Sequence, residues 1–182
     1  MVMVNGESSH DPRCDTRRAA MMLFTHGARS WLWLTALIVA ADQWSKRVVI
    51  DRFDEFDSVV LFPMLELMRL HNTGAAFSIL STASGWQRWF FIVLAIGASL
   101  GILIWLFRLP KNGSHLLAAG LCFVMGGALG NVIDRILYGY VVDFIRVHYE
   151  SWYFPAFNVA DSAITIGAGL LILDTFLQPK QD

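Results

Sequence analysis

The sequence predicts a mainly α-helical membrane protein, with four transmembrane helices and, on one membrane face, a small β-sheet and a short interfacial helix. Of its 182 residues, 55% are hydrophobic and only 16% are charged, whereas a soluble domain carries ~25% charged residues. The apolar residues gather in four segments, each close to the ~20 residues that a helix needs to cross ~30 Å of hydrocarbon. The length suits one domain. The net charge of −1 provides no overall field that would recruit nucleic acid or anionic lipid.

The four expected spans cover residues 31–50, 89–107, 115–136 and 157–177. The first carries charged residues in its second half, and the second carries none. Polar residues lie near the end of the third and near both ends of the fourth. Four crossings leave both termini on the same side of the membrane.

Cationic residues set the expected orientation. They gather before the first span and in the short turn between the second and third spans, and are sparser in the two longer loops, 51–88 and 137–156. The positive-inside rule then places the tails, 1–30 and 178–182, in the cytoplasm. Some thirty polar residues precede the first span in place of a compact signal-peptide n-region, so we expect an uncleaved span.

The outer loops are longer than connections require and contain short apolar runs that suit strands, at 58–62, 65–70 and 140–149. Asn72-Thr73-Gly74 is typical of a turn. The segment 81–88 suits the short interfacial helix, because tryptophans flank its end. We therefore expect a small sheet on the outer membrane face, beside the ends of the helices.

Small residues at four-residue spacing predict close helix packing. Gly97 and Gly101 form such a pair on the second span, and Gly126 and Gly130 form one on the third.

Strongly polar residues recur at the outer ends of three spans. They form pairs three or four residues apart, so that each pair shares a helix face, and in a compact bundle the pairs would converge at one depth. Ionisable groups inside a membrane cost ~2.5–3.5 kcal/mol at the bilayer centre and are functional candidates by default. The pairs are Asp42 with Lys46, Asn131 with Arg135, and Asn158 with Asp161.

Each polar residue also has a structural explanation. Asp42 and Lys46 could form an ion pair that eases insertion, and Asp134 could be an ordinary interfacial residue at a helix end. Asp161 could be an acid favoured by a helix N-terminus, and Asp143 a solvated strand residue. Two other functions stay open. The first is a proton- or ion-coupled carrier, but the confinement of these polar groups to one leaflet argues against it. The second is a membrane scaffold, which would not require Asp143.

The chemistry that these residue types favour is hydrolysis by two carboxylates. The sequence contains no Ser-His-Asp order, no paired histidine spacing for a metal and no Gly-rich phosphate loop, and neither Cys14 nor Cys122 has metal-ligand spacing. Two neighbouring carboxylates resist double ionisation, so the pair holds one proton. The ionised member can accept a proton from water while the protonated member donates to a substrate carbonyl. Such a pair would hydrolyse a peptide without a covalent intermediate.

Four sequence blocks occur in order along residues 31–177. They are Asp42-Gln43-Trp44-Ser45-Lys46, Asn72-Thr73-Gly74-Ala75-Ala76-Phe77, Gly130-Asn131-Val132-Ile133-Asp134-Arg135 continuing to Val142-Asp143-Phe144, and Phe157-Asn158-Val159-Ala160-Asp161-Ser162. Together with the four spans, they resemble the lipoprotein signal peptidase (signal peptidase II) family, aspartic proteases of the bacterial inner membrane.

The resemblance implies that Asp143 and Asp161 are the catalytic dyad. It implies that the substrate is a diacylglyceryl-modified prolipoprotein, cut just before its lipidated cysteine. The other matched positions, implied to bind substrate or support the dyad, are Asp42, Lys46, Asn72, Gly74, Asn131, Arg135 and Asn158.

Finer roles are hypotheses built on the resemblance. Asn131 and Arg135 would orient the substrate backbone, and Asn158 would hydrogen-bond the dyad. Asp42 and Asn72 would tie the outer sheet to the helix bundle.

The resemblance also implies partners and a location. We expect contact with membrane lipid, inhibition by globomycin-type cyclic lipopeptides, a monomer, no nucleic acid, no metal and no organic cofactor. The active site would lie on the periplasmic side of the inner membrane, with the sheet and interfacial helix on that face.

Overall fold

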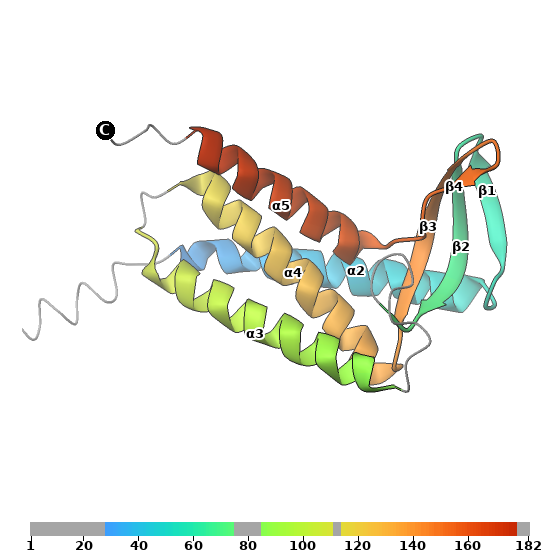
Figure 1. The fold of residues 1–182 in the computed structure, drawn as a ribbon, viewed down its shortest axis with the longest axis horizontal. Coiled ribbons are helices and arrows are strands. Elements are labelled where there is room, and N and C mark those ends of the chain that lie inside the picture. The colour runs from blue at the N-terminus through green and yellow to red at the C-terminus, as the bar shows by residue number, and fades with distance from the viewer. Residues whose placement is uncertain (1–27, 75–84, 111–113, 178–182) are drawn as a thin grey trace, which may run out of the picture.

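The computed structural model describes residues 28–74, 85–110 and 114–177 as a helix bundle with an antiparallel sheet at one end (Figure 1). The helices are η1 (Arg29–Trp31), α2 (Leu32–Arg52), α3 (Trp86–Arg108), α4 (His115–Leu137) and α5 (Val159–Leu177). The strands are β1 (Ser58–Phe62), β2 (Leu65–Asn72), β3 (Val141–Tyr149) and β4 (Trp152–Tyr153). Within the described residues, the predicted combination of helices and a small sheet is confirmed.

The four long helices match the four expected segments with shifts of up to three residues at their ends. Among the described residues, α3, α4 and α5 are long and apolar enough to cross a membrane, with mean hydropathies of 2.6, 2.0 and 1.5. Helix α2 does not meet this criterion, because Asp42, Lys46, Arg47 and Asp51 are all charged.

Helix α3 begins three residues earlier than predicted. Gly85 precedes it with φ of +91°, a left-handed conformation that glycine adopts without strain. Residues 86–88 of the predicted interfacial helix are therefore the first turn of α3, and residues 81–84 lie outside the described part of the chain.

Helix α4 lies at the centre of the bundle and packs against the other three long helices. Its glycines allow this close packing. A Cβ added to Gly126 would lie 2.9 Å from Ile38 on α2, and one added to Gly127 would lie 2.2 Å from the Ala160 carbonyl oxygen on α5. Two neighbouring helices can therefore approach the backbone of α4 closely.

The predicted glycine packing is confirmed for Gly126 and Gly130, whose positions are crowded by α2. It is wrong for Gly97 and Gly101 on α3, because no described atom lies within 4 Å of a Cβ built at either one. Spacing alone does not say which face of a helix is turned towards its neighbours.

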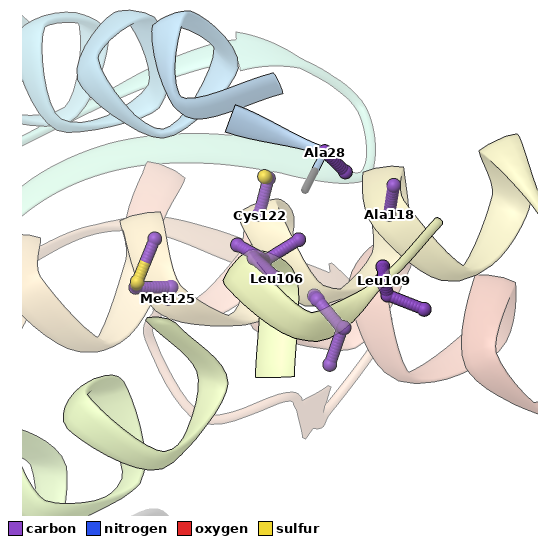
Figure 2. Packing of buried hydrophobic residues seen from close by; sticks show 7 residues of the cluster. Ala28, Leu106, Leu109, Ala118, Cys122 and Met125 are labelled. Carbon is purple, nitrogen blue, oxygen red and sulfur yellow. The ribbon is translucent and has the colours of Figure 1, made fainter. Parts of the chain in front are cut away.

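A hydrophobic cluster closes the end of the bundle away from the sheet (Figures 1 and 2). The Ala28 N–H donates to the Leu106 carbonyl oxygen at 3.0 Å and fixes the entry to α2 against the end of α3. Cys122 is fully buried in this cluster and packs as a small hydrophobic residue. The cluster consists of Ala28, Leu106, Leu109, Ala118, Leu121, Cys122 and Met125.

The sheet has the order β1-β2-β3-β4, with every pair antiparallel. Its first three strands confirm the predicted ones, whereas the two-residue β4 was not predicted. Strand β3 starts against the helices, where Val141–Phe144 is buried, and becomes more exposed towards Tyr149. At the end of β2, the Gly74 N–H donates to Asn72 Oδ1 at 3.0 Å, which confirms the predicted turn.

Candidate active site

Strand β3 carries Asp143 into the junction between the sheet and the bundle. Its side chain is 1% exposed. Asp143 pairs with Leu70 across the sheet, so Asn72 is its diagonal neighbour on the same face. Asn72 Nδ2 donates to Asp143 Oδ2 at 2.9 Å, and Asn158 Nδ2 donates to Asp143 Oδ1 at 2.8 Å. Both carboxyl oxygens are therefore held by amides.

Asp161 lies in the first turn of α5, where Asn158 immediately precedes the helix. The Asp161 N–H donates to Asn158 Oδ1 at 2.9 Å, and the Asn158 N–H donates to Asp161 Oδ2 at 3.2 Å. This is the reciprocal pattern of a capping box, with Asn and Asp three residues apart. The other oxygen, Asp161 Oδ1, accepts from Asn131 Nδ2 at 2.8 Å.

Asn158 thus connects the two carboxyl groups. Its amide nitrogen binds Asp143, while its amide oxygen and its backbone N–H bind Asp161. The side chain is fully buried, so its orientation is fixed by these partners. The expected contact between Asn158 and the two aspartates is present in the structure.

Burial raises the pKa of Asp143 to about 7, with the negative charge of Asp161 as the second cause. The hydrogen bonds from Asn72 and Asn158 lower the pKa of Asp143, but they offset the rise only in part. Asp143 can therefore hold a proton near neutral pH beside a second carboxyl group. This arrangement suits acid–base chemistry on a bound water.

Both aspartates line a cavity of about 820 Å³ between the end of β2, α4 and α5. Its volume falls within the ~300–1,000 Å³ typical of ligand pockets. Its wall combines polar side chains with apolar surface from residues such as Phe157, Ile164 and Ile166.

Arg135 also lines this cavity, but it already holds protein groups. Its Nη2 donates to the Gly74 carbonyl oxygen at 3.0 Å and its Nη1 to the Asn131 carbonyl oxygen at 3.3 Å. The guanidinium carbon lies 5.1 Å from the centre of the Phe91 ring. Arg135 therefore fixes the 72–74 turn against α4, and its role in orienting substrate stays a prediction.

Behind the cavity lies Lys46, with 2% of its side chain exposed. Its Nζ lies 2.8 Å from Asp42 Oδ2, 2.9 Å from Asp134 Oδ2 and 3.0 Å from Asn131 Oδ1. The three polar pairs predicted to converge from separate spans do converge.

Two finer expectations are wrong. Asp42 does not tie the sheet to the bundle, because it accepts the Ala160 N–H at 2.9 Å and so joins α2 to α5. Asn72 does not serve as such a tie either, since its side chain binds Asp143 and Gly74, which lie on the strands and their turn.

Two site residues were missed by the sequence reasoning. Asp134, explained above as an interfacial residue, is 1% exposed and accepts the Val142 N–H at 3.1 Å. Gln43 Nε2 donates to Asp134 Oδ1 at 2.9 Å. One feature could have revealed Asp134: an acid in the last turn of a helix is disfavoured by the helix dipole, so it requires a partner. Nothing in the sequence pattern distinguishes Gln43.

Within the described ranges, no cluster of three or more His, Cys, Asp or Glu side chains is arranged to hold a metal ion. The expectation that no metal or organic cofactor takes part stays a prediction.

Comparison with known proteins gives a consistent result. The family model described as signal peptidase (SPase) II matches residues 34–177. The lipoprotein signal peptidase of Acinetobacter baylyi is 45% identical over 170 residues, which cover 93% of this chain and 94% of that protein. The lipoprotein signal peptidase of Pseudomonas aeruginosa is 50% identical over 156 residues, covering 85% and 92%. A solved bacterial membrane enzyme superposes with a TM-score of 0.73 at 29% identity, covering 87% of this chain and 96% of that one.

Proposed function

The chain belongs to the signal peptidase II family, whose members cleave the signal peptides of prolipoproteins, and we propose that Asp143 and Asp161 perform this hydrolysis as an aspartic dyad. The observation that supports the dyad best is Asn158, whose side chain donates to the Asp143 carboxyl group and whose backbone N–H donates to the Asp161 carboxyl group at the wall of one cavity.

The proposed reaction starts with Asp143 protonated and Asp161 ionised, because the pKa of Asp143 is raised to about 7 by burial. Asp161 accepts a proton from a water molecule as the water oxygen attacks the scissile carbonyl carbon. Asp143 donates its proton to the carbonyl oxygen, giving a neutral tetrahedral diol. The diol then returns one hydroxyl proton to Asp143, and Asp161 donates its proton to the leaving nitrogen as the C–N bond breaks. Both carboxyl groups end in their starting states.

The proposed substrate is a diacylglyceryl-modified prolipoprotein, cut just before the lipidated cysteine. Its acyl chains would stay in the outer leaflet while the scissile bond lies near the headgroups. The mixed polar and apolar wall of the cavity supports this substrate class. Asn131 would then bind the substrate backbone in addition to its hydrogen bond with Asp161.

We further propose that α2 is the fourth span. It runs beside the other helices (Figure 1), and its charged residues Asp42 and Lys46 are paired and buried inside the bundle, so they need not face lipid. Both termini would be cytoplasmic, with the sheet and the dyad on the periplasmic side of the inner membrane. A single cysteine at Asp57, in a background with Cys14 and Cys122 replaced by serine, should react with an impermeant maleimide in spheroplasts. A cysteine at Arg108 should react only after lysis, and the reverse pattern would reject this orientation.

The dyad is tested with purified Asp143→Asn and Asp161→Asn in detergent, using a lipidated prolipoprotein as substrate. Each variant should fold and fail to cleave, while Asp51→Asn, which removes an exposed carboxylate paired with Arg47, should cleave normally. Cleavage by either dyad variant at a rate near that of the unmodified protein would reject the dyad.

The same preparations test the alternatives and the expected partners. A carrier would pass protons in proteoliposomes without any peptide. A scaffold would have no cleavage activity to lose. Globomycin should inhibit cleavage, and the detergent-solubilised protein should sediment as a monomer. Unchanged turnover at saturating globomycin would argue against a site of this family type.

A further inference from the structure

We propose that Asp42, Lys46 and Asp134 form a buried positioning triad that sets the places of both dyad carboxylates. This inference rests on the proposed dyad, and its own variants test it separately. The three side chains come from α2 and α4 and are each at most 2% exposed. Lys46 lies between the two carboxylates, at 2.8 Å from Asp42 and 2.9 Å from Asp134.

Each carboxylate of the triad holds the backbone directly before one dyad residue. Asp134 Oδ2 accepts the N–H of Val142, which precedes Asp143. Asp42 Oδ1 accepts the N–H of Ala160, which precedes Asp161. The two hydrogen bonds measure 3.1 Å and 2.9 Å, and both donor residues are fully buried. Because the ammonium of Lys46 binds both carboxylates, it couples the positions of two separate chain segments.

The lysine also controls the side chain that binds Asp161. Lys46 Nζ can only donate, so it selects the oxygen of the Asn131 amide, at 3.0 Å. The amide nitrogen is thereby turned to Asp161, to which it donates at 2.8 Å. Asn158 Nδ2 donates to the same oxygen at a longer 3.3 Å, so Lys46 is the shorter of the two contacts that orient the Asn131 amide towards the dyad.

None of the three residues lines the cavity that holds the dyad. They cannot touch a substrate there, so they are positioning residues rather than catalytic ones. Gln43 Nε2 also contacts both carboxylates, with Asp134 Oδ1 at 2.9 Å and Asp42 Oδ2 at 3.2 Å. Gly130 leaves the space that the triad occupies, since a Cβ there would lie 2.6 Å from Asp42 Oδ2.

The charge balance separates this role from simple helix pairing. One carboxylate would neutralise Lys46, yet two carboxylates contact it. The other nearby cation, Arg135, interacts with both acids of the dyad as well as with Asp134. A second buried carboxylate is costly to desolvate, and apolar replacements of buried ion groups are often as stable. What the second carboxylate adds is an anionic acceptor for a second backbone N–H.

The test compares Asp134→Asn with the matched control Asp51→Asn, which alters an exposed Asp–Arg pair on α2. Asparagine keeps the volume of Asp134 and leaves Lys46 paired with Asp42, but it provides only a neutral acceptor. Cleavage of lipidated prolipoprotein is measured per folded molecule, well below the onset of thermal unfolding. We expect kcat to fall at least tenfold with KM within twofold of the unmodified value, and the control to be unchanged in both.

A neutral variant, Asp42→Asn/Lys46→Met/Asp134→Asn, serves if the single variant does not fold. It removes every charge of the triad and leaves no unpaired buried ion. It should keep its thermal midpoint within a few degrees and still lose at least tenfold in kcat. Retained kcat in a folded variant, or a loss that disappears when the assay is cooled, would overturn the positioning role.

The same assay separates this inference from the proposed dyad. If Asp143→Asn and Asp161→Asn cleave normally, the dyad itself is wrong, and the triad has nothing to position. If both are inactive while Asp134→Asn and the neutral variant turn over at the unmodified rate, the dyad stands and only the triad is rejected.

Discussion

Replacing Asp143 with asparagine should stabilise the folded protein at alkaline pH and destabilise it at acidic pH. The reason is the raised pKa of about 7, which arises from burial of the carboxyl group and then from the charge of Asp161. Asparagine is neutral at every pH, so the variant avoids the desolvation of a buried carboxylate.

The size of the effect follows from the difference between the folded and unfolded states. Asp143 releases its proton near pH 3.8 in the unfolded chain and near pH 7 in the folded protein. Between these values the folded state binds more protons, so the free energy of unfolding falls as the pH rises, and it levels off above pH 7. At ~1.36 kcal/mol per pKa unit, the unmodified protein loses about 4 kcal/mol across this range.

A lost hydrogen bond opposes this gain. Both oxygens of Asp143 accept from amides, at 2.9 Å from Asn72 and 2.8 Å from Asn158. Asparagine can accept only one of these, which costs about 1–3 kcal/mol in a buried site. The variant should therefore be less stable than the unmodified protein near pH 4 and more stable by about 1–3 kcal/mol at pH 8.

The measurement is the thermal midpoint in detergent from pH 4.5 to 8.5 for both proteins. The difference between them should change sign and swing by roughly 10 °C, at about 2–4 °C per kcal/mol. The exposed Asp51→Asn variant should follow the unmodified protein throughout. Parallel curves for Asp143→Asn would refute the argument that this carboxyl group holds a proton near neutral pH.

Two further predictions concern packing and the sheet. Gly127→Ala should lower the free energy of unfolding by about 1–3 kcal/mol, because its Cβ would lie 2.2 Å from the Ala160 carbonyl oxygen. The control Gly97→Ala should leave it unchanged, because no described atom lies within 4 Å of that Cβ. Equal thermal midpoints for the two variants would contradict this packing. Arg146→Lys should lower the free energy of unfolding by roughly 1 kcal/mol. Arg146 donates to Glu66 Oε2 through Nε at 2.9 Å and Nη2 at 2.7 Å, and a lysine cannot reproduce this pair of hydrogen bonds. An unchanged midpoint of chemical denaturation would count against this prediction.

Much of the fold follows from patterns that are local in sequence. Apolar length predicted the four long helices, and β-rich runs beside turn residues predicted three strands. The two-residue strand β4 is too short to produce a pattern of its own. The failure at Gly97 and Gly101 has a different cause, since their spacing is the same as that of a buried pair and only tertiary packing decides which face is covered.

The site could be predicted where charge in an apolar segment demands an explanation. Asp42, Lys46 and Asp161 stood out for that reason. Asp134 did not, because an acid beside an arginine at a helix end resembles an interfacial residue until the Val142 N–H is seen 3.1 Å away. The role of Asn72 was misjudged because its partner depends on strand register, which a sequence pattern does not fix.

The proposed dyad is completed by α5, the last of the described helices, which provides Asp161 and is directly preceded by Asn158. During synthesis, every other described element emerges from the ribosome before it does. A nascent chain synthesised as far as β4 therefore contains Asp143 without its counterpart, and the proposed dyad is incomplete at that stage. The proposed dyad can therefore form only after α5 has been synthesised and has packed against the rest of the bundle, so the order of the helices delays the proposed activity.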